Sequence, residues 1–149
     1  MQQLENLYRQ IIMDHYKNPR NKGLVDDHHY HSVHIKNPSC GDDITIQTKV
    51  EDGTVIDVRH EGSGCSICCS SASVLSDLMK NKSVSDAKTL TQTYLLMLSN
   101  QPHDIALEES LEDAMAYQGV SKFPARIKCA SIAWKAFEES LEEKGEDDE

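Results

Sequence analysis

Cys40 and Asp42 are the residues whose types and spacing first indicate metal chemistry in this chain. They lie in residues 37–42, whose sequence NPSCGD is typical of a tight loop because it combines proline and glycine. Residues two positions apart in an extended chain point their side chains to the same side. A thiolate and a carboxylate placed in this way can bind one cation together.

Cys65 and Cys129 offer two further soft ligands from distant parts of the chain. Cys65 follows a glycine-rich stretch at an expected helix start, where the helix dipole favours a thiolate. Cys129 lies two residues past Ile127 in the last expected helix, so we expect it to point away from the apolar stripe. With Cys40 and Asp42, these thiols make a tetrahedral set that suits zinc, copper(I) or iron–sulfur species. Because the cysteines are not the close pairs of a zinc finger, spacing alone leaves separate thiols open.

Other reactive side chains each allow two interpretations. Arg126 precedes Cys129 by three residues on the same helical face, where it either stabilises thiolate charge or pairs with a surface acid. Cys68 lies on an apolar helix face, which favours a core thiol, although its C-x-x-C spacing from Cys65 also suits a metal or redox role. Cys69 points elsewhere and is interpreted as either a filler thiol or a site prone to oxidation.

Histidines concentrate before the first expected strand: His28, His29, His31 and His34. A solvated loop and strand start explains this cluster, and binding of stray metal is the alternative. His60 stands at an expected strand end near Cys65, where it can be a neighbour of the metal ligands. Gly41 and Gly64 are expected to give the backbone room near the metal.

The elements that must position these residues form an α+β pattern. Apolar residues at helical spacing predict a helix over 2–17, which Asn18, Pro19 and Gly23 terminate. Residues 33–36 are a short strand candidate, and alternating apolar residues around Asp52-Gly53 predict a β-hairpin. A loop is expected at 61–64. Further helices are expected at about 65–80, around 87–98, as a short element around 107–115, and from Pro124 onward.

Length and composition restrict the class of protein. The 149 residues suit one domain, placed at 1–141, followed by an acidic, flexible tail at 142–149. The net charge of −10 argues against a nucleic-acid surface. No apolar run approaches the roughly 20 residues of a membrane span, and the N-terminus does not suit a signal peptide, so a cytoplasmic location is expected. Five cysteines are an odd number and, in a reducing cytosol, are expected as thiols or metal ligands.

At these residues the chain resembles the SufU-type members of the IscU/SufU (NifU N-terminal-like) iron–sulfur cluster assembly family. The shared segments are NPSCGD at 37–42, EGSGCSI at 61–67, Ala72-Ser73 and ARIKCA at 125–130. Two features favour the SufU branch. Lys128 stands where scaffold-type IscU proteins have a histidine, and Cys65 and Cys129 are 129 − 65 = 64 positions apart, which leaves room for a SufU-type insertion around 84–99.

The resemblance implies a SufE/IscU-like fold: an N-terminal helix, a small antiparallel three-stranded sheet, and helices packed on one face. It also implies a zinc-dependent sulfurtransferase, an enzyme that accepts persulfide sulfur on Cys40 from a SufS-type cysteine desulfurase. Asp42, Cys65 and Cys129 would hold the zinc with Cys40, and Arg126 is a candidate catalytic residue. The expected partners are the desulfurase and a downstream iron–sulfur scaffold, and the chain is expected to be a monomer.

Two other functions fit the same residues. A scaffold that assembles and transfers a [2Fe–2S] cluster would use the same thiolates, with iron or the cluster as its cargo. A docking module would use zinc only to hold its fold. The identity of the physiological cargo, zinc or cluster, is therefore open at the level of the residues.

Overall fold

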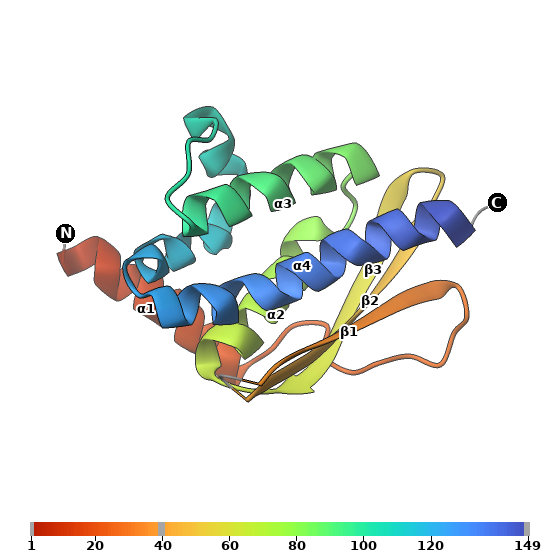
Figure 1. The fold of residues 1–149 in the computed structure, drawn as a ribbon, viewed down its shortest axis with the longest axis horizontal. Coiled ribbons are helices and arrows are strands. Elements are labelled where there is room, and N and C mark those ends of the chain that lie inside the picture. Colours follow the sequence, from red (N-terminus) through yellow and green to blue (C-terminus); the bar gives the residue numbers. More distant parts are fainter. Residues whose placement is uncertain (1, 39–40, 148–149) are drawn as a thin grey trace.

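A computed structural model describes residues 2–38 and 41–147, with side chains for 5–38 and 41–141. The chain has the expected α+β architecture, with one helix before a three-stranded antiparallel sheet and the remaining helices after it (Figure 1). The elements are α1 (Gln2–Lys17), β1 (Tyr30–Asn37), β2 (Asp42–Glu51), β3 (Thr54–Ser63), α2 (Ser66–Met79), α3 (Val84–Leu98), η1 (Ile105–Lys122) and α4 (Pro124–Asp147).

The sheet has the order β1-β2-β3, and the predicted hairpin joins β2 to β3. Its turn residues Asp52 and Gly53 have φ angles of 52° and 76°, the left-handed conformation that Asp-Gly hairpin turns require. Glu51 pairs with Thr54 across this turn. The register then places Ile46 of β2 opposite His60 of β3, on the face that the helices cover.

Helices α2 and α4 cover one face of the sheet, as Figure 1 shows. Ile44, Ile46 and Val58 bury their side chains on that face. The predicted apolar stripe of α4 packs there, and Trp134 stacks on Tyr94 of α3 with ring centroids 3.7 Å apart. Burial of these large apolar side chains supplies the main driving force for this arrangement.

Residues 18–29 run along the edge and the outer face of the sheet. Lys22 forms a parallel bridge with His60, so this segment pairs with the outer edge of β3. Gln47 of β2 then accepts a hydrogen bond from the Val25 N–H at 2.8 Å and donates one to the Val25 carbonyl at 2.9 Å. The side-chain amide thus pairs with the backbone as a strand would, and it fixes the crossing chain over β2.

Three local expectations were wrong in extent or type. Residues 61–63 are strand rather than loop, because Gly62 pairs with Ile44 and a Cβ on Gly62 would lie 2.0 Å from the Asp43 carbonyl oxygen. The expected short strand at 33–36 is eight residues long. The short helix expected around 107–115 is instead the 18-residue 3₁₀ helix η1, which is interrupted at Glu112, where φ is 51°.

The helical backbone of α4 continues to Asp147, within the acidic stretch 142–149 that the sequence sets apart as a tail. The division at residue 141 therefore stays a prediction. In the described part of the chain, no helix is both long enough and apolar enough to cross a membrane.

Candidate metal centre

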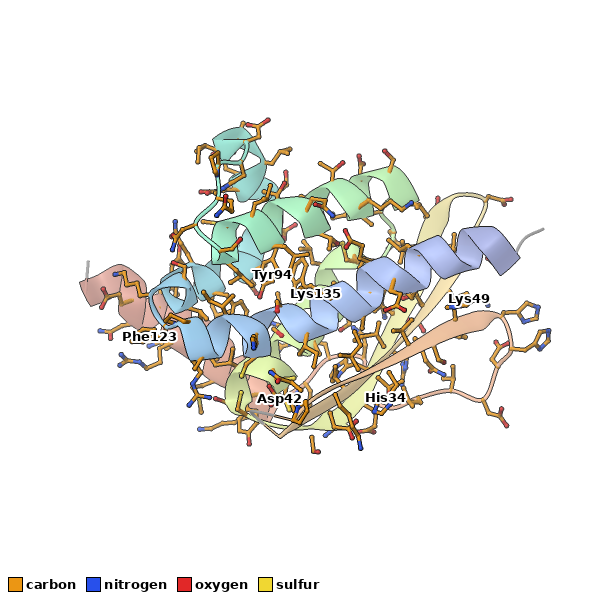
Figure 2. All side chains as sticks on the ribbon, viewed as in Figure 1. His34, Asp42, Lys49, Tyr94, Phe123 and Lys135 are labelled. Atoms are coloured by element: carbon orange, nitrogen blue, oxygen red, sulfur yellow. The ribbon has the colours of Figure 1, made fainter. Side chains whose placement is uncertain are left out.

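Asp42 begins β2 and buries its carboxylate at the end of the sheet, beside the start of α2 (Figure 2). One oxygen, Oδ1, accepts a 3.0 Å hydrogen bond from the backbone N–H of Cys65. The other, Oδ2, is also buried and has no hydrogen-bond partner among the described residues. Leaving a carboxylate oxygen dehydrated and unpaired is costly, so this atom fits a position facing a cation.

Gly64 allows the close approach of Cys65 to Asp42. Its φ is +154°, and a Cβ built on it would lie 2.3 Å from Oδ1 of Asp42. Any side chain here would displace the carboxylate. This contact agrees with the room near the metal expected for Gly64.

Cys65 is the N-cap residue of α2, as the sequence predicted, with extended φ and ψ angles of −73° and 167°. Its side chain makes no capping hydrogen bond, although its carbonyl accepts from the Cys69 N–H at 3.1 Å. Thus the backbone of Cys65 starts the helix, while its sulfur stays available to a ligand at the positive end of the helix dipole.

Cys129 lies in the second turn of α4 and is fully buried. The sequence predicted that Cys129 points away from the apolar stripe, but it did not predict that the side chain is buried. The sheet, α2 and α3 all pack on α4, so its buried face is wider than the predicted stripe and includes Ala130 and Ala133 as well as Cys129.

The ligand atoms of Asp42, Cys65 and Cys129 all lie within 4.8 Å of one another. Ligands of a tetrahedral ion with Zn–S bonds of about 2.3 Å are about 3.8 Å apart, so small side-chain movements would close the set on one ion. Two sulfurs and a carboxylate form a donor set that fits zinc. Cys40, the fourth expected ligand, lies outside the described residues.

Arg126 supplies positive charge beside this cluster. Its pKa is raised above the ordinary arginine value, first because its guanidinium hydrogen-bonds Cys129 and then because it lies near the charge of Cys65. The guanidinium itself is exposed. The structure therefore places Arg126 at the solvent side of the two sulfurs, where it can offset part of the negative charge of the ligand set.

Comparison with known proteins identifies the family. The profile of the NifU-like N terminal domain matches residues 7–130. The chain belongs to this family. It is 45% identical over 138 residues to the zinc-dependent sulfurtransferase SufU of Bacillus subtilis, covering 93% of this chain and 91% of that protein. It is 33% identical over 141 residues to the iron–sulfur cluster assembly scaffold protein IscU of Streptococcus pyogenes, covering 95% and 86%.

Solved structures of this family have the same fold. A putative iron–sulfur cluster assembly scaffold protein for the SUF system from Fervidobacterium islandicum matches with a TM-score of 0.78 at 28% identity, over 89% of this chain and 94% of that one. The N-terminal part of a NifU-like protein from Brucella abortus matches with a TM-score of 0.83 at 20% identity, over 95% and 96%. The recognised family and the expected fold class are therefore confirmed.

The two remaining cysteines of this NifU-like domain occupy different surroundings. Cys68 is fully buried in the core with Ala72 and Leu75, in agreement with the core interpretation. Cys69 is partly exposed, and its thiol donates to the Gly64 carbonyl at 3.8 Å. Burial and the neighbouring charges of Cys65 and Asp42 raise the pKa of Cys69, which makes it a poor nucleophile.

The expected histidine cluster divides into separate contacts. Nδ1 of His29 donates a 2.8 Å hydrogen bond to the Asp27 carboxylate, and ligand atoms of Asp27, His28 and His29 lie within 4.8 Å of one another on the surface. His34 pairs with Asp43 on the outer face of the sheet. His60 is buried and donates to the Arg20 carbonyl at 2.7 Å.

Two cations near the candidate centre were not singled out from the sequence. Arg9 of α1 and Lys122 of η1 line the same surface cavity as Cys65 and Arg126. Each is an ordinary exposed basic residue in its own helix. Their shared location depends on tertiary packing, so no local pattern indicates it.

Proposed function

We propose that this protein is a zinc-dependent sulfurtransferase that accepts persulfide sulfur on Cys40 from a SufS-type cysteine desulfurase and passes it to iron–sulfur cluster assembly. The observation that carries the proposal is the convergence of Asp42, Cys65 and Cys129 to within 4.8 Å, with one buried carboxylate oxygen lacking a partner among the described residues. The similarity to the SufU sulfurtransferase supports the same function.

Cys40 is the natural fourth ligand of this set. Asn37 at the end of β1 pairs with Asp42 at the start of β2, so the described residues that flank positions 39 and 40 in the sequence meet beside the candidate centre. Zinc bound by the four residues would hold their thiols deprotonated in a closed site until one ligand is released.

Sulfur transfer then follows thiol–disulfide exchange chemistry. The Cys40 thiolate attacks the terminal sulfur of the persulfide on the desulfurase cysteine. A new sulfur–sulfur bond forms on Cys40, the bond to the donor sulfur breaks, and the donor leaves as a thiolate, so the step involves no net oxidation or reduction. Arg126 faces the remaining thiolates and offsets their charge while Cys40 is displaced.

A desulfurase assay tests the proposal. Protein purified without added metal is analysed for zinc and added to the SufS-type cysteine desulfurase of the same organism. We expect about one zinc per chain, faster desulfurase turnover, and a persulfide on Cys40 detected by mass spectrometry. Cys69→Ser is the matched control and should retain all three properties. Stimulation of turnover by Cys40→Ala would contradict the mechanism.

A [2Fe–2S] scaffold is the second candidate, because the relatives include proteins named as IscU scaffolds. Cys40, Cys65 and Cys129 would then hold the cluster as cargo. Lys128 stands on the exposed side of α4 next to Cys129, and a lysine there is a poorer cluster ligand than histidine. Anaerobic reconstitution that yields a stoichiometric, transferable cluster would favour this candidate over the first.

A further inference from the structure

A surface cavity of about 600 Å³ opens beside the candidate metal centre. Its walls come from α1, the end of η1, and the beginnings of α2 and α4. We call it the α1–α4 groove and define it by Tyr8, Ile12, Met13, Val120 and Phe123, together with Arg9, Lys122 and Arg126.

The lining of the α1–α4 groove contains several exposed apolar side chains. Phe123 is 60% exposed and Met13 is 36% exposed. Figure 2 shows Phe123 beside α1 and the start of α4. Tyr8 and Ile12 add partly buried apolar surface from the neighbouring turn of α1. Several large apolar side chains that face one cavity indicate a site of contact with another molecule.

The charge of the groove is opposite to that of the chain. Arg9, Lys122 and Arg126 are all exposed, and Glu5 is the one acidic residue of the lining. The whole chain carries a net charge of −10. Three cations around an apolar floor on an acidic protein therefore select for an occupant that combines apolar and anionic groups.

The groove and the candidate metal centre share two residues. Cys65 is both a wall of the groove and a member of the ligand set, and Arg126 lines the groove while it contacts Cys129. A molecule seated in the groove consequently lies against Cys65, one of the two described sulfur ligands. This continuity connects recognition of the occupant with the site at which sulfur is proposed to arrive.

We propose that the α1–α4 groove binds a segment of the sulfur-donating desulfurase that carries an apolar side chain flanked by carboxylates. The inference rests on the proposed function, because it takes the occupant to be the sulfur donor. The apolar side chain packs against Phe123 and Ile12, and the carboxylates pair with Arg9 and Lys122. Binding in this groove positions the donor persulfide beside Cys65, a member of the candidate ligand set.

The test measures how the desulfurase rate depends on the concentration of this protein. Arg9→Glu combined with Lys122→Glu should raise the half-saturating concentration on the order of tenfold, because both cations become repulsive. Phe123→Ala should also raise the half-saturating concentration, but its response to salt should remain that of the wild type because no charge is removed. The maximal rate and the zinc content should match those of the wild type. Lys88→Glu, on the exposed side of α3, is the control for reversing a cation outside the groove and should leave the half-saturating concentration unchanged.

Added salt gives an independent readout. Increasing ionic strength should raise the half-saturating concentration of the wild type more than that of the variant with both charges reversed. Salt screens an electrostatic attraction that this variant no longer has. If the groove variants have the same half-saturating concentration as Lys88→Glu while the wild type still stimulates the desulfurase, the groove does not bind the desulfurase. The proposed function would then be unaffected. A wild type that neither stimulates nor binds the desulfurase would overturn both. Lys122→Arg keeps the positive charge and should have the half-saturating concentration of the wild type. This variant distinguishes an effect of charge from an effect of misfolding.

Discussion

The backbone N–H of Cys65 donates a 3.0 Å hydrogen bond to Oδ1 of Asp42, which joins the first residue of α2 to the first residue of β2. This bond leaves Oδ2, which is buried and has no partner among the described residues, as the oxygen that can bind a cation. Asp42 therefore has two tasks: it orients the start of α2 through one oxygen and offers the other to a cation.

Replacement of Asp42 by alanine should weaken zinc binding by about 10- to 100-fold, because it removes a ligand and the acceptor that orients Cys65. The measurement is competition for zinc against a chelator of known affinity. Asp43→Asn is the matched control, since the neighbouring carboxylate points to the opposite face and pairs with His34. Equal affinities of the two variants would exclude Asp42 from the site.

Substitution of Gly64 by alanine should lower the free energy of unfolding by about 2 kcal/mol or more, because the added Cβ would lie 2.3 Å from Oδ1 of Asp42. Zinc content should fall with it. Gly119→Ala is the control, since nothing lies within 4 Å of a Cβ built at that position. Urea unfolding of both variants provides the comparison, and a stable, zinc-replete Gly64→Ala protein would contradict the close approach.

Removal of Arg126 should slow sulfur transfer on the order of tenfold while zinc remains bound, because its guanidinium offsets the charge of the Cys129 and Cys65 sulfurs during transfer. Arg126→Lys should recover part of the rate. Lys128→Ala changes a neighbouring exposed cation and should have little effect. Single-turnover transfer to the wild-type and variant proteins measures the difference. If Arg126→Ala and Lys128→Ala transfer sulfur equally fast, Arg126 is a surface residue without a role in transfer.

Acidification should destabilise the fold through His15 and His60. Burial is the main cause that lowers the pKa of each below the ordinary value, although Asp113 and the Arg20 carbonyl act in the opposite direction. Below a pH of about 6.5 the unfolded chain binds protons that the folded chain resists. The free energy of unfolding should therefore be highest above that pH and decrease as the pH falls, by up to about 1.4 kcal/mol per pH unit for each histidine.

Urea unfolding at a series of pH values measures this slope. His15→Gln should flatten it, whereas His29→Gln changes an exposed residue and should not. All variants are measured with zinc bound, so that the pH dependence of zinc release contributes equally to each slope. A slope that is unchanged in both His15→Gln and His60→Gln would contradict the assignment.

Chelation of zinc should abolish sulfur transfer and leave the helical content intact. The core depends on contacts remote from the site, such as Trp134 stacked on Tyr94 and Ile46 beneath α4. Circular dichroism before and after chelation, followed by restoration of activity with zinc, measures both properties. Cooperative unfolding on chelation would instead favour the docking module in which zinc is purely structural.

The sequence predicted elements well where local chemistry determines them. Helix α1 has the expected bounds, and Asp52-Gly53 forms the expected turn because few other residues adopt its backbone angles. The chemistry of the candidate ligands could also be inferred from residue type. Local patterns, however, did not reveal that Cys129 is buried, because its surroundings come from the sheet, α2 and α3.

The misjudged segments depend on tertiary contacts as well. Residues 61–63 look like a loop because glycine and serine disfavour strands, but pairing with β2 compensates for that weakness. The extent of η1 and its interruption at Glu112 have no periodic signal in the sequence. The α1–α4 groove brings together residues that are more than 110 positions apart, Arg9 and Lys122 among them, so it could not be anticipated.

The pairing of Lys22 with His60 has a consequence for how the molecule behaves at high concentration. Exposed strand edges are templates on which other chains can add by backbone hydrogen bonding, which leads to fibrils and insoluble material. Residues 21–23 occupy part of that position along β3, with the Gly23 N–H donating to the His60 carbonyl at 2.8 Å. The domain thus covers part of one edge of its own sheet against the addition of strands from other chains.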